Sequence, residues 1–138
     1  MDLASLLYIT GTFTVLLGGT HFAMPVLFDF RGAIPLHGAA LKPFRLLSIG
    51  HPTSRRDVHG IAWVMNHAAS YALVDIGVLD LVWRRWLGTG AGPAIALWIA
   101  GFWSLRAASQ LYLGHRRGDW MIVAGFGAIG LVHLLVLI

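Results

Sequence analysis

Four long apolar stretches alternate with shorter, more polar segments along the chain. An α-helix rises 1.5 Å per residue, so about 20 apolar residues cross the roughly 30 Å hydrocarbon core of a bilayer. The pattern predicts a single all-α integral membrane domain, folded as a four-transmembrane-helix antiparallel bundle. The predicted spans cover residues 3–28, 60–83, 93–113 and 120–138. Residues 29–59 lie between the first and second spans. They contain three prolines and several glycines and are expected to form a long first loop.

The overall composition agrees with this interpretation. Hydrophobic residues make up 57% of the chain and charged residues only 12%, whereas soluble domains carry about 25% charged residues. Cysteine and glutamate are both absent, which excludes disulfides, thiolate catalysis, iron–sulfur clusters and Cys-ligated zinc. The net charge of +4 comes from basic residues in the connecting segments, where they favour anionic lipid headgroups over nucleic acid. The predicted partners are the lipid bilayer and a hydrophobic small molecule, with a homo-oligomer as an open alternative.

The basic residues also predict an orientation. Seven of them lie in the first and third connecting segments: Arg31, Lys42, Arg45, Arg55, Arg56, Arg116 and Arg117. The second connecting segment contains only Arg84 and Arg85. Because cytoplasmic loops of membrane proteins are enriched in lysine and arginine, we expect a multi-pass inner (plasma) membrane protein. Loops 29–59 and 114–119 are then cytoplasmic, and both termini lie outside.

The second span carries most of the polar residues expected at membrane depth. Asn66, His67, Ser70, Tyr71 and Asp75 all lie in its interior. Ionisable groups are costly in a bilayer, so they usually face a bundle interior or a water-filled cavity and mark function. This span therefore predicts the position of a site.

Depth along the predicted helices suggests which residues share that site. His21, His67 and Arg106 each lie about seven residues, or roughly 10 Å, from the cytoplasmic end of their spans. Asn66 lies beside His67, and Gln110 lies one turn closer to the cytoplasm. The layer predicts a polar cavity near the cytoplasmic face.

A second layer is expected deeper in the membrane. Asp75 and His133 both lie roughly 21 Å from the cytoplasmic ends of their spans, close enough in depth to form a hydrogen bond. Asp80 comes close to the outer interface and is expected to be solvated.

The residue types in these layers suit acid–base chemistry on a lipophilic substrate. Arg106 would hold an anionic group, while His67 or His21 would transfer a proton. Isomerisation, lyase or hydratase, cyclase and transferase chemistry all fit this set. The predicted catalytic residues are His67, Arg106, Asp75 and His21. The predicted substrate-binding residues are Asn66, Tyr71, Gln110 and Trp63, and no metal site is expected.

The overall plan is similar to that of the membrane-associated eicosanoid and glutathione metabolism superfamily. The shared features are the size, four spans, a long first cytoplasmic loop, outside termini, and polar groups with an arginine near the cytoplasmic face. That family places an asparagine and a glutamate on its second span. Asn66 could stand in for the asparagine, but this chain has no glutamate. Glutathione is therefore kept as an analogy and no residue role is carried over.

Two other functions remain open. A helical bundle could bind one haem b, with His21 and His67 as axial ligands. Alternatively, the chain is a non-catalytic subunit that packs against a partner through glycine-lined faces, such as those at Gly18 and Gly127. No cofactor is predicted outright, and haem b and glutathione are the alternatives.

Overall fold

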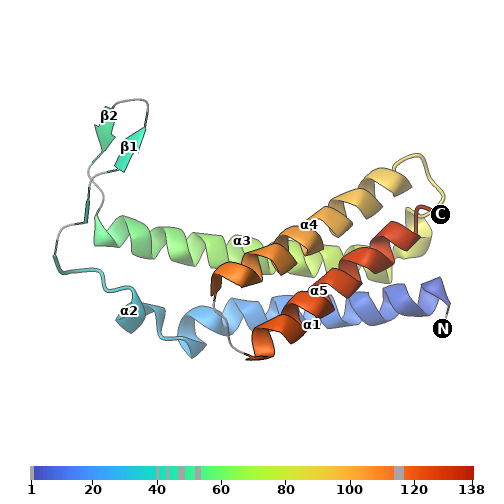
Figure 1. Cartoon of the computed structure of the whole chain (residues 1–138), viewed down its shortest axis with the longest axis horizontal. Helices are drawn as coiled ribbons and strands as arrows, with labels where there is room; N and C mark the ends of the chain where they lie inside the picture. The colour runs from blue at the N-terminus through green and yellow to red at the C-terminus, as the bar shows by residue number, and fades with distance from the viewer. Residues whose placement is uncertain (1, 40, 43, 47–48, 52–53, 114–116) are drawn as a thin grey trace. The chain divides into compact units, whose positions relative to one another are not determined.

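The computed structural model describes residues 2–39, 41–42, 44–46, 49–51, 54–113 and 117–138. In chain order the elements are α1 (Leu3–Leu27), α2 (Phe30–Ala33), β1 (Phe44–Leu46), β2 (Ile49–His51), α3 (Arg55–Leu81), the 3₁₀ turn η1 (Trp83–Arg85), α4 (Gly92–Leu113) and α5 (Arg117–Leu135) (Figure 1). The described chain is thus overwhelmingly helical. The predicted helical fold class is confirmed.

Helix α3 begins at Arg55 rather than at Gly60, where hydropathy alone placed its start. Its first turn is closed by a reciprocal cap. The Asp57 backbone N–H donates to Ser54 Oγ at 3.1 Å, and the Ser54 backbone N–H donates to Asp57 Oδ2 at 3.0 Å. Such a capping box satisfies backbone donors that the helix itself leaves unpaired. The polar first turn therefore belongs to the helix, although it is too polar to count as part of an apolar span.

The segment predicted as a long loop contains a small hairpin. Strands β1 and β2 pair antiparallel, with Phe44 opposite His51 and Leu46 opposite Ile49. The four-residue helix α2 precedes them, and its N-cap residue Asp29 accepts a hydrogen bond from the Gly32 backbone N–H. The described residues between α2 and α3 are non-helical, as the prolines of this segment predicted.

Two helices among the described residues are long and apolar enough to cross a membrane. They are Leu3–Leu27 and Gly118–Leu135, each with a mean hydropathy of 1.5 in its most apolar window. Helices α3 and α4 do not meet the same criterion, and α3 carries buried or half-buried Asn66, Asp75 and Asp80. A membrane location is therefore compatible with the structure, and it is α1 and α5 that support it.

The chain divides into two compact units. The first unit contains Met1–Phe13 and Ile76–Ile138, and the second contains Thr14–Asp75. Helices α1 and α3 contribute residues to both units. We describe each unit separately.

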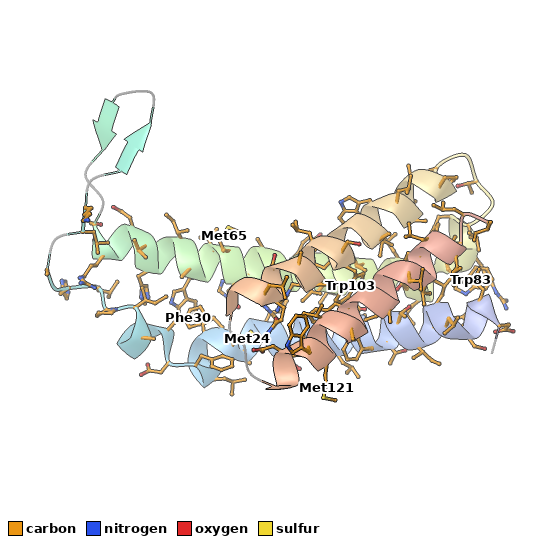
Figure 2. All side chains as sticks on the ribbon, in the orientation of Figure 1. Met24, Phe30, Met65, Trp83, Trp103 and Met121 are labelled. Carbon is orange, nitrogen blue, oxygen red and sulfur yellow. The ribbon has the colours of Figure 1, made fainter. Side chains whose placement is uncertain are left out.

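In the first unit, α4 and α5 lie side by side (Figure 1). Trp103, which is labelled in Figure 2, is fully buried and packs its ring on Phe126 of α5 at a centroid distance of 5.0 Å. Gly130 makes the close approach on α5, because a Cβ there would lie 3.4 Å from the Ala100 carbonyl oxygen. A Cβ at Gly127 would meet nothing within 4 Å. Gly130 therefore faces α4 within the chain, and the predicted packing of Gly127 against a partner stays a prediction.

In the second unit, the second half of α1 packs on α3 at Gly18. A Cβ at Gly18 would lie 2.8 Å from Val74 Cγ2 and 2.9 Å from the Val74 backbone nitrogen. No side chain fits there without a backbone shift, so glycine is required by the close approach of the two helices. Gly18 is therefore used for a close helix contact within the chain, and its predicted packing against a partner stays a prediction.

Apolar and polar side chains are distributed in an unusual way on these helices. Large apolar side chains project outward, including Val26 on α1 and Met121 on α5, both 78% exposed; Met121 is labelled in Figure 2. The buried set meanwhile includes Asn66, Ser70, Asp80, Gln110 and His133. In water this arrangement exposes apolar surface and hides polar groups, whereas in a bilayer it places each kind of side chain favourably.

Candidate functional site

Three rings stand one above another on α3. His59, Trp63 and His67 are spaced by four residues, so they share one face of the helix. The ring centroids of His59 and Trp63 are 6.1 Å apart, and those of Trp63 and His67 are 5.7 Å apart. We call these three residues the α3 ring stack.

Neighbouring elements of the second unit add two further rings. Phe30 of α2, labelled in Figure 2, meets Trp63 edge-on at 6.3 Å. Phe22 of α1 lies 5.9 Å from the ring of His67. The α3 ring stack is thereby held by aromatic contacts from α1 and α2, which limit the orientations of Trp63 and His67.

The two histidines of the stack differ in their hydrogen bonding. His59 Nδ1 lies 2.6 Å from the carbonyl oxygen of Ile34, and since a carbonyl only accepts, Nδ1 carries the proton. His67 is exposed and makes ring contacts but no hydrogen bond within the described residues. Its imidazole nitrogens are therefore available to a molecule that binds beside the stack.

A groove of about 320 Å³ runs along Trp63. Its lining combines the apolar Pro25 and Val26 at the end of α1 with the charged Asp29 and Arg31. The indole Nε1 of Trp63 is buried and has no hydrogen-bond partner among the described residues. An unpaired buried donor costs about 1–3 kcal/mol, so an acceptor supplied from outside the chain would be favoured there.

A separate polar network ties α1 to α3 behind this face. The Ser70 hydroxyl donates to the Asn66 carbonyl oxygen at 2.6 Å, and His21 Nδ1 lies 3.3 Å from Ser70 Oγ. Because the one Ser70 proton is used, His21 Nδ1–H is the donor to Ser70. The Asn66 side-chain amide donates to the His21 carbonyl oxygen at 3.0 Å. His21 and Asn66 thus act here as an interhelical connection.

The remaining predicted residues are distributed as follows. Tyr71 is 64% exposed, and Asp75 is half-buried without a described hydrogen bond. Arg106 and Gln110 belong to the first unit, whereas His21, Asn66 and His67 belong to the second. The predicted layer that joins Arg106 to these histidines stays a prediction.

Within the first unit Arg106 and Gln110 form a chain of hydrogen bonds. The Arg106 guanidinium donates to Gln110 Oε1 at 3.1 Å, and Gln110 Nε2 donates to Asp119 Oδ1 at 3.0 Å. The guanidinium carbon of Arg106 lies 5.0 Å from the centre of the Phe126 ring, a cation–π distance. Among the described contacts Arg106 has no carboxylate of its own, so it retains donors for an anionic group.

The acid that pairs with His133 is Asp80, and both side chains are fully buried. The expectation that Asp80 is solvated is therefore wrong, and so is the pairing of His133 with Asp75. Helix α3 has 27 residues and α5 has 19, so counting from the ends that were expected to be cytoplasmic misaligned them. Counted from the other ends, Asp80 precedes the end of α3 by one residue and His133 precedes the end of α5 by two.

His59 is the site residue that sequence reasoning missed. The hydropathy pattern starts the second span at Gly60 and therefore leaves His59 at the edge of the first loop. The regular spacing of His59, Trp63 and His67 was the available signal, since residues four apart on a helix share a face. Over the described ranges there is no group of three or more His, Cys, Asp or Glu side chains arranged to hold a metal ion.

No protein-family model matches this sequence, and no curated protein or solved structure matches it either. The resemblance to the membrane-associated eicosanoid and glutathione metabolism superfamily thus gains no support from a structural match. The site has to be interpreted from its own geometry.

Proposed function

We propose that this chain is a four-span protein of the inner membrane that binds a lipophilic molecule with an oxygen-bearing head group beside Trp63. The observation that carries this proposal is the groove along Trp63, which Arg31 and apolar side chains also line, together with the buried indole N–H of Trp63, which has no partner among the described residues. Ligand sites commonly combine an apolar lining with a few polar groups that orient the ligand.

The membrane part of the proposal rests on the distribution of side chains. Helices α1 and α5 have apolar exteriors, and buried polar residues link the helices within each unit. Helices α3 and α4 have lengths of 27 and 22 residues, enough to span when their polar residues face protein. Loops 29–59 and 114–119 are cytoplasmic in this proposal, and both termini lie outside.

The groove chemistry selects the kind of head group. In this proposal the head group supplies an acceptor oxygen to the Arg31 guanidinium, which belongs to a lining residue, and to the buried Trp63 Nε1–H, which has no partner among the described residues. Asp29 Oδ1 is already occupied by the Gly32 backbone N–H. A carbonyl, carboxylate or phosphate head group fits these donors, and an apolar tail would lie along Pro25 and Val26.

His67 supplies the group for acid–base chemistry on such a molecule. It stacks on Trp63 and has no described hydrogen bond that would fix its protonation. A neutral imidazole has one nitrogen that donates a proton and one that accepts a proton, so it can transfer a proton to or from a bound molecule.

The test is to purify the protein gently from its native membrane into nanodiscs and to identify the extracted small molecules by mass spectrometry. The wild type should carry a lipophilic molecule with an acceptor head group. Trp63→Phe keeps the ring and removes the N–H, so bound ligand should fall by about 2–10-fold, the worth of one hydrogen bond. Trp98→Phe is the matched control, because Trp98 is 51% exposed on α4.

Three outcomes would contradict the proposal. Equal ligand loss in Trp63→Phe and Trp98→Phe would remove the groove as the site. A Soret band that His21→Ala or His67→Ala abolishes would replace it with haem binding. Purification of the wild type with partner proteins and no small molecule would favour a non-catalytic subunit.

The enzymatic part needs a separate measurement once the bound molecule is known. Turnover of that molecule should be lost in His67→Gln while its binding remains, since His67 would then act on the ligand rather than hold it. Unchanged turnover in His67→Gln would leave a carrier or binding protein.

The absence of native cysteines makes the proposed orientation testable with single cysteines at Ala39 and Leu137 and a membrane-impermeant thiol reagent.

A further inference from the structure

A fully buried acid–base pair joins three helices of the first unit. His133 Nε2 of α5 lies 2.8 Å from Asp80 Oδ1 of α3, and both side chains have 0% exposure. The Thr10 hydroxyl of α1 lies 3.0 Å from the other carboxyl oxygen, Asp80 Oδ2. The groove function proposed above does not use this pair.

The hydrogen bonds fix how many protons the pair can hold. His133 Nδ1 lies 2.8 Å from the carbonyl oxygen of Ile129, its own helix, so Nδ1 carries a proton in every state. One further proton then lies between His133 Nε2 and Asp80 Oδ1. If this proton is on His133 Nε2, an imidazolium faces a carboxylate. If it is on Asp80 Oδ1, a neutral imidazole faces a carboxylic acid. The pair has no net charge in either case.

Among the described contacts of the pair there is no other charged group to balance it. The described contacts of Asp80 come from His133 and from Thr10 and Gly11 of α1. Helix α4 packs on α5 at Gly130 and presents the Ala100 backbone, Ser104 and Trp103 there. Within these described contacts, Asp80 and His133 are the sole titratable groups.

We propose that Asp80 and His133 form a proton-binding site that holds one shared proton, and that uptake of a second proton separates α5 from α1 and α3. The second proton comes from water and adds to the Asp80 carboxylate while the imidazolium keeps both of its protons. The pair then carries one buried positive charge without a partner. Such a charge costs several kcal/mol in a low-dielectric interior, so the contact opens and the charge reaches water.

The position of the pair gives it a route to one aqueous phase. Asp80 and His133 both lie within two residues of the ends of their helices. A groove of about 230 Å³ at the same end is lined by Val136 and Leu137 together with residues of the 87–93 segment. Water or a buffer ion in that groove lies next to the end of α5, so the site would respond to acidity on the side of the chain termini.

The absence of cysteine allows a distance measurement across the pair. Spin labels at Ile9→Cys on α1 and Leu134→Cys on α5 occupy exposed positions, 56% and 42% exposed in the native chain. The distance between them is measured in nanodiscs at neutral and acidic pH. Infrared difference spectra over the same pH range report whether a buried carboxyl group becomes protonated.

The wild type should show a longer and broader distance distribution at acidic pH, together with a carboxylic acid band that Asp80→Asn removes. The double variant Asp80→Asn with His133→Gln keeps donors and acceptors but has no titratable group, so its distance should not change. His37→Gln removes an exposed histidine and should keep the wild-type response.

Asp80→Asn alone serves if the double variant does not fold. Its amide can donate to His133 Nε2 and accept from Thr10, and its difference spectrum should lack the carboxylic acid band. The proposal is overturned if the wild-type distance stays constant over the folded pH range. It is equally overturned if the variants without Asp80 respond to acid as the wild type does.

Discussion

The two regions of polar residues in this chain differ in how completely their hydrogen bonds are made. The buried pair Asp80–His133 is enclosed and each polar atom of the pair has a described partner. The α3 ring stack has an exposed His67 without a hydrogen bond and a Trp63 N–H without an acceptor. A buried pair whose hydrogen bonds are all made resists rearrangement. Polar groups without a hydrogen-bond partner are available to bind a ligand. This contrast supports our proposal that a ligand binds at the ring stack, whereas the pair connects α3 to α5.

Removal of Asp80 should have the largest effect on stability. Asp80→Ala leaves His133 buried without its partner, and breaking a buried ion pair in this way costs about 3–5 kcal/mol. Asp75→Ala is the matched control on the same helix, since Asp75 is half-buried without a described hydrogen bond and should cost about 0.5 kcal/mol or less. Denaturant unfolding in detergent micelles measures both. Similar losses for the two variants would contradict the assigned role of Asp80.

The next largest effect is expected at the close approach of α1 and α3. Gly18→Ala would place a Cβ 2.9 Å from the Val74 backbone nitrogen, which cannot rotate away, and overpacking of this kind costs about 1–3 kcal/mol. Gly19→Ala, whose Cβ would meet nothing within 4 Å, should be neutral or slightly stabilising because alanine favours helix. The comparison uses the same unfolding measurement. Equal behaviour of the two neighbours would mean that α1 does not approach α3 at Gly18.

A smaller loss is expected behind the ring stack. Ser70→Ala removes the acceptor of His21 Nδ1–H and should cost about 1 kcal/mol. Ser109→Ala is the control, because the Ser109 hydroxyl donates only to Leu105 of its own helix in the described contacts. Ligand content measured on the same samples should stay near the wild-type value in both variants. A Ser70→Ala protein that is fully stable but has lost its ligand would move the binding site to the His21 side of α3.

The smallest effect concerns the start of α3 at low pH. Hydrogen bonds from the Ser54 side chain and backbone hold the pKa of Asp57 below its ordinary value. The cap therefore stabilises the first turn above about pH 4 and is lost as the pH falls through that lowered pKa. Amide hydrogen exchange in the first turn of α3 should rise there, after correction for intrinsic rates. The first turn of α4 contains no acidic residue and should not respond.

The helices were predictable from the sequence, but the polar contacts were not. Hydropathy placed all four long helices, because an apolar stretch of about 20 residues is a strong local signal. The partner of His133 could not be obtained in the same way. Asp75 and Asp80 are five residues apart, about 7.5 Å along the helix, and this is comparable to the error in a predicted helix end.

The choice among the glycines of α5 could not be made from the sequence for a related reason. Gly125, Gly127 and Gly130 are equally small, and their sequence spacing alone does not say which of them faces α4. The structure selects Gly130, whereas Cβ positions at Gly125 and Gly127 are open. The rotation of a helix about its axis is decided by tertiary packing, and that information is not carried by glycine content.

Histidine-selective labelling with diethyl pyrocarbonate tests the contrast between the two regions most directly. The protein is labelled in nanodiscs at neutral pH, with and without its extracted ligand, and each histidine is followed by peptide mass spectrometry. His67 should react quickly and become protected when the ligand is returned, while the fully buried His133 should react slowly in both samples. A His133 that reacts as fast as His67, or a ligand-free His67 that does not react, would contradict the account.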